Sequence, residues 1–234
     1  MKKRRPDSAM RESGSAGSIL QNIRKDFRVE FRNRYALNVS LSFAVISTLA
    51  ISLASGGVPV SVKMQAVLFW IVLFFSAMNG LSHIFIREEE QETALFLRLN
   101  AAPEVVLTSK LAFNIILFFI LEIVITPLFV FFLQVEIKAA PLFLLTVITG
   151  GFAVSVSATI LAAIVAKAGG RGSLFTVIAF PIILPVLWIA INSTSQALEN
   201  PMGADYKNLV FLLAFSGAIG ALSYLMFEHI WMEE

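Results

Sequence analysis

Long apolar runs alternate with short polar connections along most of this chain. Each run is close to the roughly 20 residues that a helix needs to cross about 30 Å of hydrocarbon. The pattern predicts an all-α integral membrane protein with six transmembrane helices, forming one domain over residues 36–234. The runs lie at about residues 36–55, 65–86, 111–133, 142–165, 173–192 and 208–227.

The composition agrees with this interpretation. Hydrophobic residues make up 57% of the 234 residues and charged residues 15%, with a mean hydropathy of +0.80. Soluble domains are usually about 45–50% apolar and about 25% charged, which excludes an ordinary soluble fold. Cysteine is absent, so a disulfide framework and a thiolate metal site are excluded as well.

The N-terminal region divides into two parts. Residues 1–17 are basic and rich in serine and glycine, which predicts a disordered cytoplasmic tail. Residues 18–35 have apolar side chains at every fourth position, so that these share one helical face. The apolar positions are Ile19, Ile23, Phe27, Phe31 and Tyr35, and basic residues cover most of the remaining surface.

An amphipathic helix of this kind is expected to lie in the membrane interface. Phe27 and Phe31 would enter the acyl boundary, while Arg28 and Arg32 would meet anionic lipid headgroups. The alternative is a basic run that only fixes the topology.

The distribution of positive charge predicts the orientation. With the N-terminus inside, the cytoplasmic segments carry fifteen of the eighteen lysines and arginines. The external connections carry only Lys63, Lys138 and Lys207. Because cytoplasmic loops are enriched in lysine and arginine, both termini and the loop 87–110 are predicted to be cytoplasmic.

The loop 87–110 has an unusual order of residues. An acidic group comes first and suits the N-terminal end of a short helix; apolar residues follow, and Pro103 comes after the helix. Such an element offers a soluble partner an acidic patch beside an apolar knob, although a solvated loop is the simpler alternative. The candidate contact residues are Glu88, Glu89, Glu90, Glu92, Leu95, Arg98 and Leu99.

A few polar residues lie inside the apolar runs. Glu122 is near the middle of its run, where a carboxylate is costly and functional by default. We expect Ser155 and Ser157 to hydrogen-bond its neutral form, in a role in helix packing or in a transport path. His83 and Asn114 lie at similar depth and are predicted to form a polar pair, with haem ligation by His83 as the alternative.

Other signals concern the fifth apolar run and catalysis. Pro181 and Pro185 are predicted to kink the helix that contains them. The glycine-rich segment 169–172 lacks the lysine of a phosphate-binding loop, so we expect a tight cytoplasmic turn there, with a second contact for the soluble partner as a further candidate role. No catalytic motif is present, and ATP would be hydrolysed by another subunit.

Three stretches together resemble the CcmB family, the membrane subunit of the cytochrome c maturation ABC transporter. The resemblance extends over about residues 20–230, but Thr93-Ala94-Leu95-Phe96 departs from the family pattern of glycine, a small hydroxyl residue, leucine and an acidic residue. The stretches are KDFRVEFRNR (25–34), FIREEEQE (85–92) leading through Leu95 to PEVVLTSK (103–110), and AGGRGSL (168–174) followed by FPIILP (180–185).

The resemblance implies an ABC-2-type permease fold in the bacterial inner membrane. Two copies would pair with two CcmA-like ATPase subunits, and a coupling helix in the loop 87–110 would contact the ATPase. It also implies work with a haem-handling membrane protein and a periplasmic haem chaperone, with haem as substrate of the complex and no directly bound cofactor. Alternatives are an exporter of lipid, polysaccharide or drug, or a membrane scaffold that transports nothing.

Overall fold

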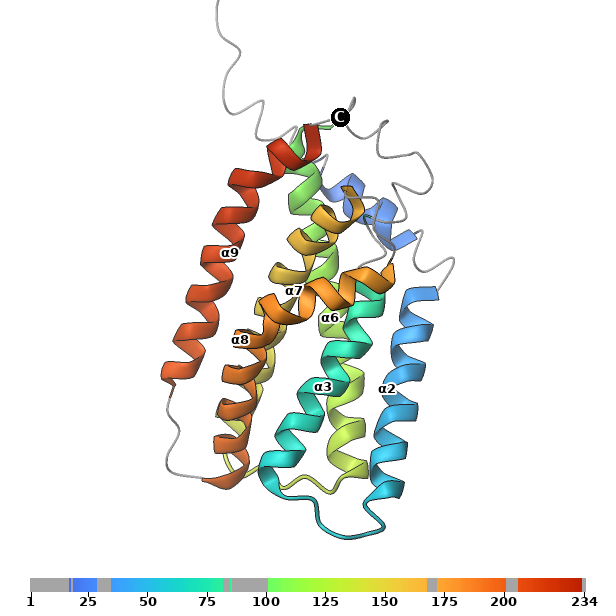
Figure 1. The fold of residues 1–234 in the computed structure, drawn as a ribbon, viewed down its shortest axis with the longest axis vertical. Coiled ribbons are helices and arrows are strands. Elements are labelled where there is room, and N and C mark those ends of the chain that lie inside the picture. The colour runs from blue at the N-terminus through green and yellow to red at the C-terminus, as the bar shows by residue number, and fades with distance from the viewer. Residues whose placement is uncertain are drawn as a thin grey trace, which may run out of the picture.

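Every regular element in the described part of the chain is helical. The computed structural model describes residues 17, 19–28, 35–81, 85, 101–167, 172–200 and 206–232. Residues 19–28 form a helical segment, called the N-terminal segment below. Six longer helices run side by side as a bundle (Figure 1). They are α2 (Tyr35–Ala54), α3 (Val62–Leu81), α6 (Pro103–Phe132), α7 (Ala140–Lys167), α8 (Gly172–Glu199) and α9 (Lys207–Met232).

Each predicted apolar run corresponds to one of these helices, but two predicted boundaries are wrong. The loop expected to reach Lys110 ends at Ala102, because Pro103 suits a first helical turn and Val105 to Leu107 are buried. α8 continues to Glu199 through the expected external connection, since Ser193 and Ala197 pack inside the bundle. Residues 1–16, which make up nearly all of the predicted tail, lie outside the described residues.

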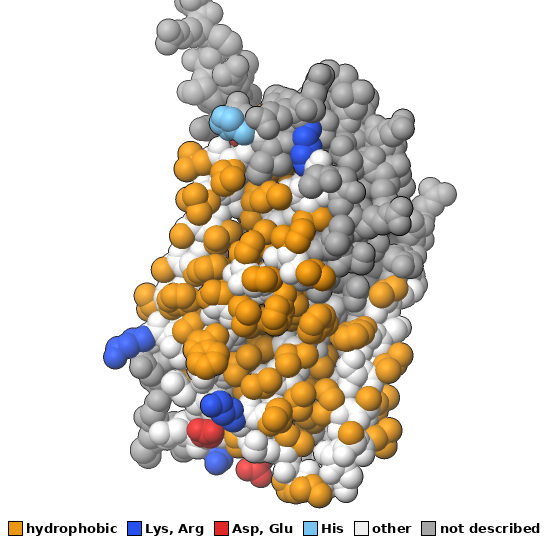
Figure 2. Space-filling view, in the orientation of Figure 1, with side chains coloured by type: hydrophobic (Ala, Val, Ile, Leu, Met, Phe, Trp, Pro, Cys, Tyr) orange, Lys and Arg blue, Asp and Glu red, His pale blue; other side chains and the backbone are white. Residues whose placement is uncertain are grey.

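The helices have the length and surface of membrane-spanning segments. Five of them, α2 and α6 to α9, are long and apolar enough to cross a membrane, and α3 contains a shorter apolar stretch, Val62–Met78. Apolar side chains cover much of the described surface between the two ends of the bundle (Figure 2). Because water would not tolerate such a surface on a monomer, the chain is a multi-pass α-helical membrane protein.

Helix α7 is the centre of the bundle. It contacts α3, α6, α8 and α9. In its apolar membrane-spanning stretch 78% of the residues are buried, against 17% in that of α2. Small residues on α7 allow this close approach. At Gly150 a Cβ would lie 2.9 Å from Cζ2 of Trp70 on α3 and would meet the ring still more closely at Cη2, so only glycine fits beneath the indole.

The two ends of the bundle differ in what they carry. The N-terminal segment, the start of α6 and the end of α9 lie at one end (Figure 1), called the junction end below. α8 also starts there and changes direction along its length (Figure 1). Pro181 and Pro185 both lie inside this helix, and prolines in a helix interior are a usual cause of such bends.

Candidate functional site

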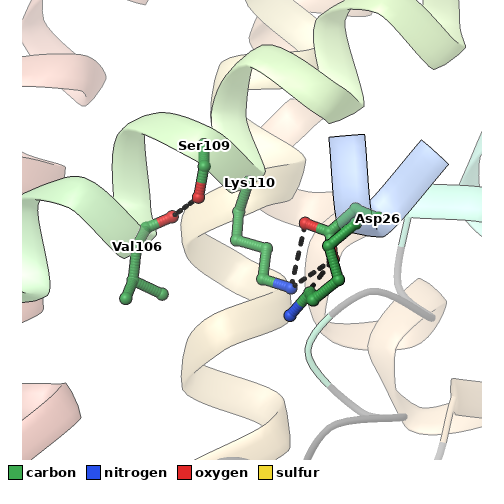
Figure 3. Close-up of polar contacts among 5 residues, drawn as sticks. Asp26, Val106, Ser109 and Lys110 are labelled. Atoms are coloured by element: carbon green, nitrogen blue, oxygen red, sulfur yellow. Dashed lines mark hydrogen bonds and ion pairs between the residues drawn. The ribbon is translucent and has the colours of Figure 1, made fainter. Parts of the chain in front are cut away.

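A buried ion pair links the N-terminal segment to α6 at the junction end. Nζ of Lys110 lies 3.2 Å from Oδ2 of Asp26 and donates a hydrogen bond of 3.3 Å to Oδ1 (Figure 3). The side chains are only 2% and 8% exposed. Lys25, which is 43% exposed, approaches Oδ1 at 3.5 Å from outside. The pair therefore joins two segments far apart in the sequence through charges that are almost completely removed from solvent.

One aromatic ring contacts this ion pair, and a second aromatic contact joins the same two segments. Nζ of Lys110 lies 5.9 Å from the centroid of the Phe85 ring, and the centroids of Phe27 and Phe113 are 4.8 Å apart. Phe85 also contacts Phe227 of α9, at 6.0 Å. We call Asp26, Phe27, Phe85, Lys110 and Phe113 the Lys110 cluster. It brings together the N-terminal segment, the chain just beyond α3 and the second and third turns of α6.

The electrostatic cost of burial explains why the contact is specific. Removing a carboxylate and an ammonium group from water costs several kcal/mol per ion unless each finds a close partner. Both carboxylate oxygens of Asp26 lie within 3.3 Å of Nζ, and the Phe85 ring adds a cation–π contact. Separation of the two segments would expose or strand both charges, so the arrangement holds them in one relative position.

The predicted contact residues of the loop lie outside the described residues, and so do Phe31 and Arg32. Those residues are Glu88, Glu89, Glu90, Glu92, Leu95, Arg98 and Leu99. The structure does describe the residues on either side, Phe85 and Ala101. Phe27 is half-buried against Phe113 and Arg28 is exposed; their predicted role at the membrane surface stays a prediction.

Glu122 lies deep between α6 and α7. It is 3% exposed, and its Oε1 has no hydrogen-bond partner among the described residues. The expected hydrogen bonds from Ser155 and Ser157 are absent, because these hydroxyls donate to Gly151 O and Ala153 O of their own helix, both at 2.8 Å. Glu122 instead packs against Gly151, where a Cβ would lie 2.7 Å from its Cδ.

Asn114 links the same two helices nearer the junction end. Its Nδ2 donates a hydrogen bond of 3.0 Å to Oγ1 of Thr159 on α7, and both residues are buried. Its predicted partner, His83, lies outside the described residues. The described part of the chain therefore gives Asn114 a role in joining α6 to α7.

Replacing Thr159 with valine tests this role. The variant keeps the side-chain shape but leaves Nδ2 of Asn114 without its acceptor, and should lower the free energy of unfolding by roughly 0.6–1.7 kcal/mol. Unfolding of the detergent-solubilised protein gives the measurement. Ser157→Ala is the control, because among the described residues Ser157 bonds only to Ala153 O of its own helix. Equal losses for both variants would contradict the assignment.

Side-chain hydrogen bonds also organise the far end of the bundle. Ser52 donates to Phe132 O at 3.0 Å and Gln65 donates to Leu133 O at 3.3 Å. These bonds satisfy carbonyls that the end of α6 leaves without intrahelical partners. The cavity beside them, of about 450 Å³, is thus walled by groups that already serve the fold.

Sequence reasoning missed Asp26 and Lys110, although both left a signal. Asp26 follows Ile19 and Ile23 at positions i+7 and i+3, which places one acidic residue on the apolar stripe of the N-terminal segment. Lys110 directly precedes a long apolar run. The predicted loop 87–110 includes Lys110 as its last residue, whereas it lies in the second turn of α6 with its ammonium group facing Asp26.

The helices, their apolar surface and the polar contacts between them define a multi-pass helical membrane protein with a charged junction at one end. The family model described as CcmB protein matches residues 18–229. The chain therefore belongs to the CcmB family, as the three sequence stretches predict. It is a membrane subunit of the ABC-transporter-related type associated with cytochrome c biogenesis and haem transport. No curated protein matches the chain.

Proposed function

We propose that this chain is the permease subunit of an ABC complex for cytochrome c maturation. It couples ATP hydrolysis by a separate, CcmA-like ATPase to haem export or to release of a haem-loaded periplasmic chaperone. The chain acts as a pair of copies beside a haem-handling membrane protein. Haem is the substrate of the complex, and ATP binds to the partner subunit.

The proposed topology has six crossings of the bacterial inner membrane with both termini in the cytoplasm. Six helices of the bundle support it, including α3, whose apolar stretch Val62–Met78 is shorter than the others. At the end of the bundle opposite the junction end, the described lysines are Lys63 in the first turn of α3, Lys138 just before α7 and Lys207 at the start of α9. Their small number there supports an external location for that end.

The Lys110 cluster is the observation that carries the proposal. Phe85 and Lys110 lie on either side of the chain between residues 86 and 100 and contact each other through a cation–π pair. A force applied by an ATPase to that connection would reach α6 and the N-terminal segment directly. From α6 it would pass to α7 through contacts such as Asn114 to Thr159.

Charge reversal of the acidic group between residues 86 and 100 tests this function. We expect the wild-type chain to co-purify with a CcmA-like ATPase, and a variant with Glu88, Glu89, Glu90 and Glu92 changed to lysine to lose it. The physical reason is electrostatic complementarity: lysines in place of the acidic side chains would repel an ATPase surface that attracts the glutamates. Co-expression in a membrane fraction, followed by affinity capture, gives the measurement.

Glu104→Lys is the matched control, since Glu104 is an exposed carboxylate in the first turn of α6 at the same end of the bundle. It should leave co-purification unchanged. If both variants retain the ATPase, the acidic group is not the contact. If the wild-type chain captures no ATPase, the proposed function fails and a scaffold becomes the better hypothesis.

A further inference from the structure

We propose that Asp26 is a positioning residue that makes the N-terminal segment part of the coupling machinery. Its ion pair with Lys110 fixes this segment to α6, so that the two move as one body when the ATPase acts on the connection between Phe85 and Ala101. This inference rests on the proposed function, and it assigns the N-terminal segment a mechanical role in addition to its predicted contact with the membrane.

The burial of Lys110 makes its link to Asp26 rigid. Among the lysines and arginines whose burial the structure describes, it alone is buried. Its ammonium group cannot follow α6 away from Asp26 without losing both carboxylate oxygens, at 3.2 and 3.3 Å. A rigid link between the segments follows, because a buried charge without its partner is strongly unfavourable.

The ion pair lies where the two sides of the connection 86–100 meet. Lys110 is in the second turn of α6, and Phe85 lies just before residues 86–100. Both sides of that connection therefore converge on the same ammonium group, which Asp26 holds in place. If Phe85 or α6 moves, the N-terminal segment therefore moves with it. If the N-terminal segment stays in place, it resists movement of Phe85 and α6.

A second, uncharged contact also holds the N-terminal segment against α6, so the effect of the ion pair on the position of the segment can be tested separately from its attachment. Phe27 packs on Phe113 at 4.8 Å without any charge, and it lies next to Asp26 on the same segment. Loss of the Asp26 charge should thus leave the segment near α6 but free to take several positions. Asp26→Asn is the appropriate variant, because it keeps the side-chain shape and removes the charge.

The first test uses the chain without its partner. Since the protein has no cysteine, spin labels can be placed at Gln21→Cys and Glu104→Cys, two exposed positions on the N-terminal segment and α6. Pulsed electron resonance in nanodiscs should give a narrow distance distribution for the otherwise wild-type chain and a broad one for Asp26→Asn. Lys25→Met, which removes the exposed lysine beside Asp26, should keep the narrow distribution. A wild-type distribution in Asp26→Asn would overturn the proposal.

The second test uses the complex with the ATPase. Asp26→Asn should still capture the ATPase, while the amount of haem released per ATP hydrolysed falls about fivefold or more, a loss as large as the smaller coupling effects known between two binding sites. The charge-swapped pair Asp26→Lys with Lys110→Asp should recover most of that loss, which a merely destabilised variant would not do. Unchanged coupling in Asp26→Asn would overturn the positioning role. A wild-type chain that captures no ATPase would instead defeat the proposed function, and the distance measurement would stand apart from it.

Discussion

Replacing Trp70 with alanine is expected to lower the free energy of unfolding by about 3–5 kcal/mol, the usual cost of truncating a buried aromatic side chain. Trp70 is 1% exposed and lies over Gly150 of α7, while its Nε1 donates a hydrogen bond of 2.9 Å to Thr194 of α8. One side chain on α3 thus fills the space between two other helices. Denaturant or thermal unfolding in detergent measures the loss.

Trp188→Ala is the control for this experiment. Trp188 is on α8 and is 64% exposed, so it faces the lipid and its truncation leaves no cavity inside the protein. We expect a loss several times smaller than for Trp70. Similar losses for the two tryptophans would mean that the contact of Trp70 with α7 and α8 contributes little to stability.

Gly150→Ala should destabilise the same contact between α3 and α7 from the side of α7, by about 1–3 kcal/mol. The added Cβ would lie 2.9 Å from Cζ2 of Trp70, and a rigid indole that is 1% exposed has no room to move away. This penalty should exceed the roughly 0.5–1 kcal/mol that alanine normally gains over glycine in a helix. The same unfolding measurement applies.

Gly217→Ala provides the opposite expectation. A Cβ at Gly217 on α9 meets nothing within 4 Å, so this variant should keep or slightly raise stability. The sign of the change therefore distinguishes steric exclusion from general helix propensity. If Gly150→Ala also raises stability, the close approach of α3 to α7 is not tight enough to require glycine.

The number and order of the helices could be predicted from the sequence because apolar runs of membrane length are a strong signal. The faces of these helices could not. Lipid is as apolar as the protein interior, so Ile123, which is 73% exposed, and Leu121, which is fully buried, give the same signal on α6. Neighbouring helices decide which side of α6 is covered, and the sequence of α6 alone does not contain that information.

The candidate site was predictable only in part. The stretches that resemble the CcmB family include both Asp26 and Lys110, yet the local pattern places Lys110 in a loop and indicates no role for Asp26. Their pairing spans 84 positions in the sequence, and no local periodicity reports a contact at that separation. Glu122 was found because an acidic residue within an apolar run is rare. Its contact with Gly151 of α7 could not be predicted, because it depends on how two helices pack.

The central place of α7 also constrains how the protein can be made. Its surface is covered by α3 and α6, which precede it in the chain, and by α8 and α9, which follow it. Because synthesis proceeds from the N-terminus, α7 enters the membrane with one side still open and remains so until α9 has emerged. A chain that stops before residue 207 would lack α9 and would expose to lipid the side of α7 that α9 covers in the finished protein. Quality-control proteases of the membrane would then have a means of distinguishing an unfinished chain from a finished one.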